Sequence, residues 1–271
     1  MGESEASEAV STFLDRIEVA KPGTLQSLVL TKEIKRTDEH GRVLFAQRMI
    51  RAEKYDVDKA VKRAIDHSVW RKQVLGPEGS IPDDHVREQL EEGKVFLQIE
   101  TRSNRPLLFV QVKKHSPNKT DLEVLKKFVV YSLETATYFL DSPEYGNPDG
   151  TMDVLFDIRG MTWANFDVAG LKSSFTVLAQ AFPERIHKIY MLDPPYLFDM
   201  IWKIVKPFVD PVSREKVEFL HGDKGVETLK DAIGEEYLPQ EVTGLDTRPL
   251  PIDQAMRKVT SESCVVHSSL E

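Results

Sequence analysis

The feature of this chain that most constrains its fold is the alternation of short apolar runs with helical patterns between residues 107 and 233. Four runs rich in Val, Ile, Leu and Phe predict strands: Leu107–Val112, Asp153–Ile158, His187–Leu192 and Lys216–Leu220. Apolar residues at helical spacing predict helices between and after them: Leu122–Leu140, Val168–Phe182, Tyr196–Val205 and Val226–Ile233. This alternation indicates an α/β domain with a mostly parallel sheet flanked by helices.

The residues before these runs predict a small all-α domain. The pattern from Val43 to Lys72 is helical, with Asp56 as its N-cap, and Gly76 begins the Gly-Pro-Glu-Gly stretch that ends it. Further along, Thr120 and Glu123 are expected to form a capping box. We therefore divide the chain into an acidic flexible lead-in (1–20), an N-terminal helical domain (21–78), an α/β domain (79–246) and a flexible C-terminal tail (247–271).

The composition narrows the compartment and the partners. The 271 residues carry a net charge of −8, which does not favour a nucleic-acid partner. The one cysteine, Cys264, excludes an intramolecular disulfide and fits a reducing compartment. The acidic start of the chain is unlike a signal peptide, and no apolar run is long enough to span a bilayer. We expect a cytoplasmic monomer that meets membranes only from outside.

The chain lacks the usual sequence signatures of catalysis. It has no GxxxxGK[ST] or GxGxxG phosphate loop and no GxSxG nucleophile turn. Its seven histidines are scattered, and no two of them are three or four residues apart, so a zinc site is not expected. We therefore predict a binding protein rather than an enzyme, with no catalytic residues, no metal and no cofactor.

The segment Tyr196–Val205 is unusual because apolar residues cover nearly every side of the expected helix. A surface helix normally keeps one polar face. One interpretation is a core helix that is packed on both sides. The other is a lid with one face over an apolar cavity and the other toward lipid, so that Lys203 and Lys206 reach the headgroups.

Several segments, in order from Val43 to Gly244, resemble one known family. The segment Phe182–Phe198 has its Pro-Glu-Arg turn, Lys-x-Tyr strand and Pro-x-x-Phe helix start, and Ile204–Pro211 has its Lys-Pro-Phe run. The matching is completed by its strand and turn at Val154–Gly160, its closing segment at Glu235–Pro239, and its N-terminal helical motifs at Arg51–Ala60 and Trp70–Lys72. The chain thus resembles CRAL-TRIO lipid-binding proteins of the phosphatidylinositol transfer type, with their N-terminal helical domain.

The resemblance implies that the α/β domain encloses an apolar lipid pocket, closed by a mobile gate helix. The gate residues would be Tyr196, Phe198, Met200, Ile201, Trp202 and Val205, with Lys203 and Lys206 facing the membrane. Hinges are expected near Pro194-Pro195 and Lys206-Pro207. The function implied is binding and transfer of a membrane phospholipid by gated exchange during transient, peripheral contact with the bilayer surface.

The phosphatidylinositol branch of the family implies a headgroup site formed by Lys54, Glu184, Ser213 and Lys216. Lysine can bind the phosphate and glutamate can accept from ring hydroxyls. One departure is Glu53, where that branch favours Arg. The alternative is a purely structural role, in which Glu184 and Arg185 only cap and solvate a turn, or Glu184 forms a structural ion pair with Lys216.

Phosphatidylcholine is less favoured, since the positions where that branch has hydroxyl residues hold Met152 and Val154. Two other functions stay open: a carrier of a tocopherol-like or retinoid-like molecule, and a lipid-sensing module that acts on a regulatory protein partner. Trp163 could line the pocket or lie in the core, and we expect the core. Asp157 is expected to have a structural role.

Overall fold

The structure is a computed structural model that describes residues 3–34, 39–76, 79–141, 143–147, 149–209 and 211–259. The chain divides into two compact units. The N-terminal unit consists of Met1–Ile81 with Leu178–Glu184, and the C-terminal unit consists of Pro82–Val177 with Arg185–Glu271. Each unit has a core of its own, so each is described by itself.

Four helices of the described chain begin the N-terminal unit: α1 (Glu3–Ala20), α2 (Thr24–Leu30), α3 (Glu39–Ala52) and α4 (Val57–Leu75). Their apolar faces form one core that includes the fully buried Phe13, Phe45 and Met49. The predicted N-cap Asp56 is confirmed, because its side chain accepts from the Lys59 backbone N–H at 3.1 Å. Gly76, at φ 67°, follows the last turn of α4, a backbone conformation that favours glycine.

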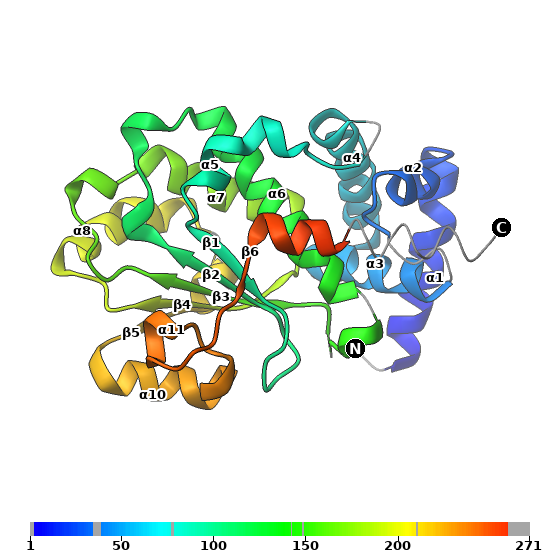
Figure 1. Cartoon of the computed structure of the whole chain (residues 1–271). Helices are drawn as coiled ribbons and strands as arrows, with labels where there is room; N and C mark the ends of the chain where they lie inside the picture. The colour runs from blue at the N-terminus through cyan, green and yellow to red at the C-terminus, as the bar shows by residue number, and fades with distance from the viewer. Residues whose placement is uncertain are drawn as a thin grey trace. The chain divides into compact units, whose positions relative to one another are not determined.

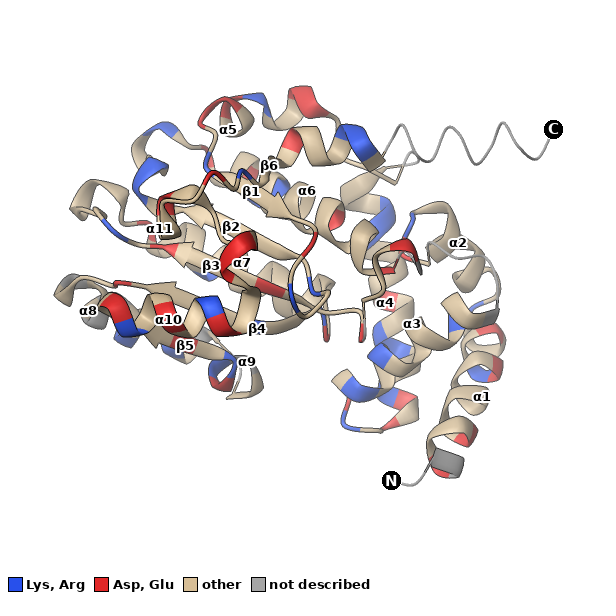
Figure 2. Ribbon diagram, turned by 60° about the horizontal axis from the view of Figure 1, so that its bottom comes forward, with Lys and Arg blue, Asp and Glu red and all other residues tan. Residues whose placement is uncertain are grey.

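Helix α1 differs from the flexible lead-in that the acidic composition suggested. Its acidic residues are spaced along the helix (Figure 2), and the residues between them include Val10, Phe13 and Ile17. These three apolar residues follow helical spacing and are buried in the core of the unit. The periodicity of the apolar side chains, rather than the net charge, therefore decides the conformation of this segment.

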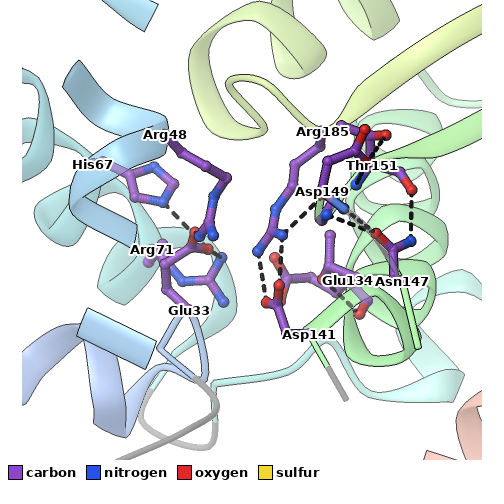
Figure 3. A network of polar contacts seen from close by, with 12 residues as sticks. Glu33, Arg48, His67, Arg71, Glu134, Asp141, Asn147, Asp149, Thr151 and Arg185 are labelled. Carbon is purple, nitrogen blue, oxygen red and sulfur yellow. Dashed lines mark hydrogen bonds and ion pairs between the residues drawn. The ribbon is translucent and has the colours of Figure 1, made fainter. Parts of the chain in front are cut away.

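A buried charge cluster fastens α3 and α4 to the segment after α2. The Glu33 carboxylate accepts from Arg48 at 2.9 Å and from Arg71 at 2.8 Å, and His67 lies 3.5 Å away (Figure 3). Arg71, with no exposed surface, also donates to the Thr31 carbonyl. Burial alone would raise the pKa of Glu33, but Arg71, His67 and Arg48 together hold that pKa well below its ordinary value.

The C-terminal unit is built on a six-stranded sheet in the order β5-β4-β3-β2-β1-β6. The strands are β1 (Val95–Gln98), β2 (Leu107–Gln111), β3 (Met152–Asp157), β4 (Ile186–Leu192), β5 (Val217–Leu220) and β6 (Leu250–Pro251). Strands β2 to β5 are parallel to one another, whereas β1 is antiparallel to both β2 and β6. The mostly parallel sheet predicted from the alternating pattern is confirmed.

Helices cover both faces of this sheet. Figure 1 shows α10 and α11 on one side, and α6 and α7 on the other. The longer helices are α6 (Leu122–Asp141), α7 (Val168–Ala181), α8 (Tyr196–Val205) and α10 (Gly222–Ile233), and the short ones are α5 (Arg87–Glu91), α9 (Pro211–Glu215) and α11 (Gln240–Thr243). The 3-10 turns are η1 (Asp83–Val86), η2 (Val112–Lys114), η3 (Pro117–Lys119), η4 (Pro143–Tyr145), η5 (Trp163–Asn165), η6 (Lys206–Phe208) and η7 (Glu235–Tyr237).

The sheet face toward α10 carries a closely packed core. Phe109, Leu155 and Tyr190 from three successive strands pack with Leu229 and Ile233 of α10, and all five are almost completely buried. Phe109 pairs with Leu155 and Leu155 with Tyr190 in the strand register, so the three side chains share one face. This face has the dense packing of an ordinary protein interior.

One local expectation in the C-terminal unit, the cap of α6, is wrong. Helix α6 is capped by Asp121, whose carboxylate accepts from the backbone of Glu123 and Val124 at 2.8 and 3.1 Å. The predicted capping box of Thr120 and Glu123 does not form, because the Thr120 hydroxyl donates to the Ser116 carbonyl instead. Asp121 has a short carboxylate at the position that reaches the free N–H groups of the first turn.

The beginning of the expected C-terminal tail is also ordered. Strand β6 pairs with β1, and residues 252–259 are helical, with Ile252 and Ala255 buried. The sequence pattern missed β6 because two residues are too few to show an alternation. Cys264 lies outside the described residues.

Replacing Glu33 with Gln is expected to lower the free energy of unfolding at pH 7 by roughly 3 to 5 kcal/mol, because buried Arg71 and Arg48 would lose their counterion. The folded-state pKa of Glu33 is lowered, so its contribution to stability is complete above the unfolded pKa of about 4.3 and is lost as the pH falls through the folded pKa. Urea unfolding of both proteins between acid and neutral pH measures this. The difference in the free energy of unfolding between the two proteins should shrink as the pH falls through the folded pKa of Glu33. A difference that stays constant with pH, or no difference at neutral pH, would contradict this account.

Candidate functional site

The sheet face opposite α10 is apolar along two complete rows. One row crosses four strands in register as Leu108, Val154, Ile189 and Val217, and the next row, nearer the carboxyl ends, is Val110, Phe156, Met191 and Phe219. Side chains that are direct cross-strand partners project from the same face. We call these eight residues the apolar face, since it contains no polar side chain.

The apolar face is less completely covered than the face toward α10. Val110 and Phe156 are cross-strand partners, and each is only partly buried on an otherwise buried strand. On β5, Phe219 is 38% exposed. The apolar residues Val168, Leu171 and Phe175 of α7 are also only partly buried. Apolar side chains that retain exposed surface at the carboxyl end of a parallel sheet are suited to an apolar ligand.

Helix α8 is attached to the edge of this face by aromatic contacts. The Phe219 ring lies 5.9 Å from the Phe198 ring and 5.4 Å from the Trp202 ring, both edge-to-face. Phe198 and Val205 are 7% and 2% exposed, and Trp202 is half-buried. These residues are four and three positions apart, so they form one buried stripe on the helix.

The opposite side of α8 is also apolar but faces outward. Tyr196 is 97% exposed, Met200 58% and Ile204 47%, and these residues are spaced by four along the helix. Lys203 and Lys206 are exposed beside them. The helix therefore has an inner apolar stripe (Phe198, Trp202 and Val205) and an outer apolar stripe (Tyr196, Met200 and Ile204). The side chain of Ile201 lies outside the described residues.

The connection from β4 into α8 is fixed by hydrogen bonds at Asp193, and two prolines follow that residue. Asp193 has a left-handed backbone at φ 46°, which costs energy for a residue other than glycine. Its backbone N–H donates to Leu220 at 2.8 Å, and its carboxylate accepts from the Gly222 N–H at 2.6 Å. Pro194 and Pro195 follow without a backbone N–H to donate. The rigid sheet edge thus ends at Asp193, directly before the helix.

The four residues expected at a headgroup lie in different parts of the fold. Lys54 and Glu184 belong to the N-terminal unit, at the turns after α3 and after α7. Both have left-handed backbones, at φ 52° and 56°, an uncommon conformation that clusters at functional sites. Lys54 is exposed and Glu184 half-buried.

The other two headgroup candidates belong to the C-terminal unit. Lys216 lies between α9 and β5, is half-buried, and accepts a hydrogen bond at its backbone carbonyl from Ile189 at 2.8 Å. Ser213 lies on α9, and its side chain is outside the described residues. The ladder bond of Lys216 fixes its backbone at the start of β5.

Glu53, the departure beside Lys54, is neutralised locally. Its carboxylate accepts from Arg63 of α4 at 2.8 Å, and the same guanidinium donates to the Ala179 carbonyl at 2.5 Å. Ala179 lies five residues before Glu184, within the part of α7 that belongs to the N-terminal unit. Arg63 therefore compensates the charge of Glu53 and ties the turn of Lys54 to the end of α7.

Arg185 is a structural residue rather than a solvated one. Its guanidinium is 2% exposed and binds both carboxylate oxygens of Asp141, at 2.6 and 2.7 Å, with a further bond to the Gly150 carbonyl (Figure 3). The paired geometry is the strong form of this interaction. The Pro-Glu-Arg motif therefore divides, with Arg185 fixing the start of β4 and Glu184 on the preceding strained turn.

Two structural carboxylates on β3 lie on the side of the sheet away from the apolar face. Asp157 binds Arg159 through both oxygens at 2.8 and 2.9 Å, which agrees with the structural role expected for it. Asp153 is buried 2.9 Å from His187, and burial raises the pKa of this carboxyl despite the nearby imidazole. Each carboxylate is paired with a protein side chain, which indicates a structural role.

A buried lysine that the sequence pattern did not single out forms a further polar cluster. The Lys94 ammonium contacts Gln89 at 2.6 Å, Glu92 at 2.5 Å and His115 at 3.1 Å. His115 in turn lies 3.0 Å from Asp167, which caps the first turn of α7 through Gly170. Burial lowers the pKa of both Lys94 and His115. Each donor in the cluster has a protein partner, which indicates a structural role.

The expectation that Trp163 lies in the core is wrong. Trp163 is 65% exposed on the turn η5, and its ring contacts the ring of Phe166 edge-to-face at 6.1 Å. The apolar character of an indole predicted burial, but the turn has no helical or strand periodicity that could have indicated its direction.

Within the described ranges, no group of three or more His, Cys, Asp or Glu side chains could hold a metal ion. The same part of the chain contains no helix with both the length and the apolar character needed to cross a bilayer.

The comparison with protein families decides the classification. Residues 90–244, more than half of the chain, match the model of the CRAL/TRIO domain. The chain belongs to the CRAL/TRIO domain family. The matched range contains all of β2 to β5 and α6 to α10, and therefore the whole apolar face and helix α8.

Several relatives share this domain. Phosphatidylinositol transfer protein CSR1 of Eremothecium gossypii is 29% identical over 210 residues, covering 73% of this chain and 46% of that protein. SEC14 cytosolic factor of Candida glabrata is 27% identical over 211 residues, covering 73% of this chain and 68% of that protein. The chain spans less than half the length of several curated relatives that it matches.

A solved structure agrees with the fold over nearly the whole chain. The crystal structure of Sfh5 matches with a TM-score of 0.61 at 15% identity, covering 95% of this chain and 98% of that one. At this level of identity the likeness concerns the fold alone.

Proposed function

We propose that this CRAL/TRIO protein binds a membrane phospholipid, most favourably phosphatidylinositol, and transfers it between bilayers. The observation that carries this proposal is the apolar face, whose residues Val110, Phe156 and Phe219 retain exposed surface beside a helix with two apolar stripes. The relatives named as phosphatidylinositol transfer protein and as SEC14 cytosolic factor support the same function and a cytoplasmic place of action.

The acyl chains would lie against the apolar face. Two acyl chains of ordinary length contain about 30 methylenes, each worth about 0.8 kcal/mol on removal from water, so about 20 kcal/mol or more opposes release into solvent. Exchange through water is therefore too slow, and it must take place at the bilayer. The protein supplies an apolar environment equivalent to the membrane interior and needs no covalent chemistry.

Helix α8 is proposed as the gate for this exchange. Its outer stripe can enter the interface while Lys203 and Lys206 reach anionic headgroups. Its inner stripe would uncover Phe219 as the helix moves about Pro194-Pro195 at one end and Lys206-Pro207 at the other. The fixation of Asp193 supports a hinge directly after that residue, because the sheet edge holds the chain up to this point.

The inositol phosphate would be recognised by Lys54, Glu184, Ser213 and Lys216. A phosphodiester carries one negative charge, which a lysine ammonium binds by charge-assisted hydrogen bonds, and Glu184 can accept from ring hydroxyls. The neutralisation of Glu53 by Arg63 supports the role of Lys54, because it removes a competing carboxylate. Met152 and Val154 are buried and lack hydroxyls, which favours phosphatidylinositol over phosphatidylcholine.

Lys216→Ala and Glu184→Gln are each expected to reduce phosphatidylinositol transfer between vesicles about tenfold or more. The first removes a charge-assisted hydrogen bond to the phosphate, and the second replaces a charged acceptor with a neutral amide. The measurement is the transfer rate of labelled phosphatidylinositol, beside that of labelled phosphatidylcholine. Lys224→Ala and Glu227→Gln are the matched controls, since both residues lie on α10 at the other face of the sheet.

Unchanged phosphatidylinositol transfer in both headgroup variants would remove these residues from the site. Binding of a tocopherol-like or retinoid-like molecule that is indifferent to Lys216→Ala would favour the terpenoid carrier. A bound phospholipid without transfer would favour the lipid-sensing module.

Ile204→Asp is expected to reduce transfer about tenfold or more while the free energy of unfolding changes by no more than about 0.5 kcal/mol, because the residue is on the outer stripe. Val205→Asp is the contrast: its side chain is 2% exposed, and a buried carboxylate should destabilise the fold by roughly 3 to 5 kcal/mol. Vesicle transfer and urea unfolding are measured together. Wild-type transfer by the Ile204 variant would show that the outer stripe of α8 does not act at the membrane.

A further inference from the structure

The turn η5 exposes a tryptophan on a rigid support. Trp163 is 65% exposed, although an indole has a large apolar surface. The turn is closed by a capping box in which the Asn165 side-chain oxygen accepts from the Thr162 N–H at 2.9 Å. The Thr162 hydroxyl in turn accepts from the Ala164 N–H at 3.3 Å. These bonds define the backbone conformation of the turn at Trp163.

A second set of bonds ties this turn to the neighbouring connection. The Asn165 side-chain amide donates to the Lys113 carbonyl at 3.0 Å and to the His115 carbonyl at 2.9 Å. Phe166 supports the indole from one side. An exposed tryptophan on a turn with bonds of this kind is held outward by the fold, rather than left outside because it lacks a place in the core.

Two exposed lysines lie on the turn that is hydrogen-bonded to η5. Lys113 and Lys114 are exposed on the adjoining turn η2, and the Lys114 ammonium is fixed at the sheet edge by the Gly93 carbonyl at 2.7 Å. The nearest acidic residues in sequence have cationic or imidazole partners, Asp157 in Arg159 and Asp167 in His115. Tryptophan with lysines is the composition that favours an anionic lipid surface.

The topology places this surface at the same sheet edge as the start of α8. Strands β2, β3 and β4 are parallel, and their carboxyl ends lead into η2, into the loop of Trp163 and into Tyr196, respectively. Carboxyl ends of parallel strands meet at one edge. Two exposed aromatic side chains, Trp163 and the 97% exposed Tyr196, thus arise from adjacent strand ends.

We propose that Trp163, together with Lys113 and Lys114, is a second membrane contact, separate from α8, which inserts its indole among anionic phospholipid headgroups. This inference rests on the proposed function, since exchange at a bilayer requires docking. A fixed contact of this kind would keep the protein on the membrane while α8 moves, so that opening of the gate does not release the protein.

The test is the affinity of the full chain for vesicles of phosphatidylcholine with phosphatidylserine, measured by co-sedimentation. Trp163→Ala is expected to weaken binding about tenfold and Lys113→Ala about fivefold, the latter corresponding to about 1 kcal/mol for one lysine near an anionic surface. Trp163→Phe should retain part of the affinity, and Lys224→Ala on α10 is the matched control. Tryptophan emission should shift to shorter wavelength on vesicle addition, and the shift should be larger in the wild type than in Trp163→Ala, which retains Trp70 and Trp202.

Equal vesicle affinity of the wild type and Trp163→Ala, with the same emission shift, would overturn the inference. It would also be overturned if the wild type were a dimer and Trp163→Ala a monomer, since the indole would then contact a second copy of the chain. Failure of the proposed function is distinguishable, because it appears as absence of a co-purifying phospholipid, whereas vesicle affinity is measured without any exchange.

Discussion

The register of four parallel strands is the constraint on which the rest of the site depends. Val110 pairs with Phe156, and Phe156 pairs with Met191. Because side chains alternate along a strand, this register places Asp153 and Asp157 of β3 on the opposite face. A slip of one residue would exchange the faces and place carboxylates among apolar side chains. The pairing therefore separates a close-packed structural face from a face on which apolar surface remains exposed.

Buried polar clusters maintain this arrangement at some cost. Arg185 with Asp141 fixes the start of β4, and Lys94 with His115 and Asp167 links β1 to the start of α7. Our hypothesis is that buried charges of this kind contribute less to net stability than to the uniqueness of the structure. It applies to this domain because one face of the sheet is incompletely packed. Such a face contributes fewer packing contacts, so the defined geometry has to come from directional bonds.

Helix α8 has an apolar stripe on each of two sides, and the two stripes have different surroundings. The helix packs on Phe219 through an inner stripe of aromatic and aliphatic residues, but its outer stripe is equally apolar. In water the outer stripe is unfavourable, and at a bilayer it is favourable. One helix therefore has both properties: its inner stripe attaches it to the domain, and its outer stripe favours a membrane.

Sequence patterns predicted the four parallel strands and α8, because both depend on local periodicity, but they missed β1 and β6. The strand DVLFDI alternates carboxylates with Val154 and Phe156, and this alternation could have identified the apolar face from the sequence. Helix α1 was missed because its acidic residues obscured the spacing of Phe13 and Ile17. The outward direction of Trp163 and the partners of Glu53 depend on long-range bonds to Lys113 and Arg63, which no local pattern encodes.

The central claim is that the apolar face holds the acyl chains of a phospholipid, and mass spectrometry of lipids extracted from the purified protein tests it most directly. The account predicts a stoichiometric diacyl phospholipid, enriched in phosphatidylinositol, in the wild type. It also predicts that Val110→Trp, which would place an indole on the apolar face at β2, loses that lipid while remaining folded. Absence of any acyl lipid from the wild type, or equal lipid content in both proteins, would contradict the account.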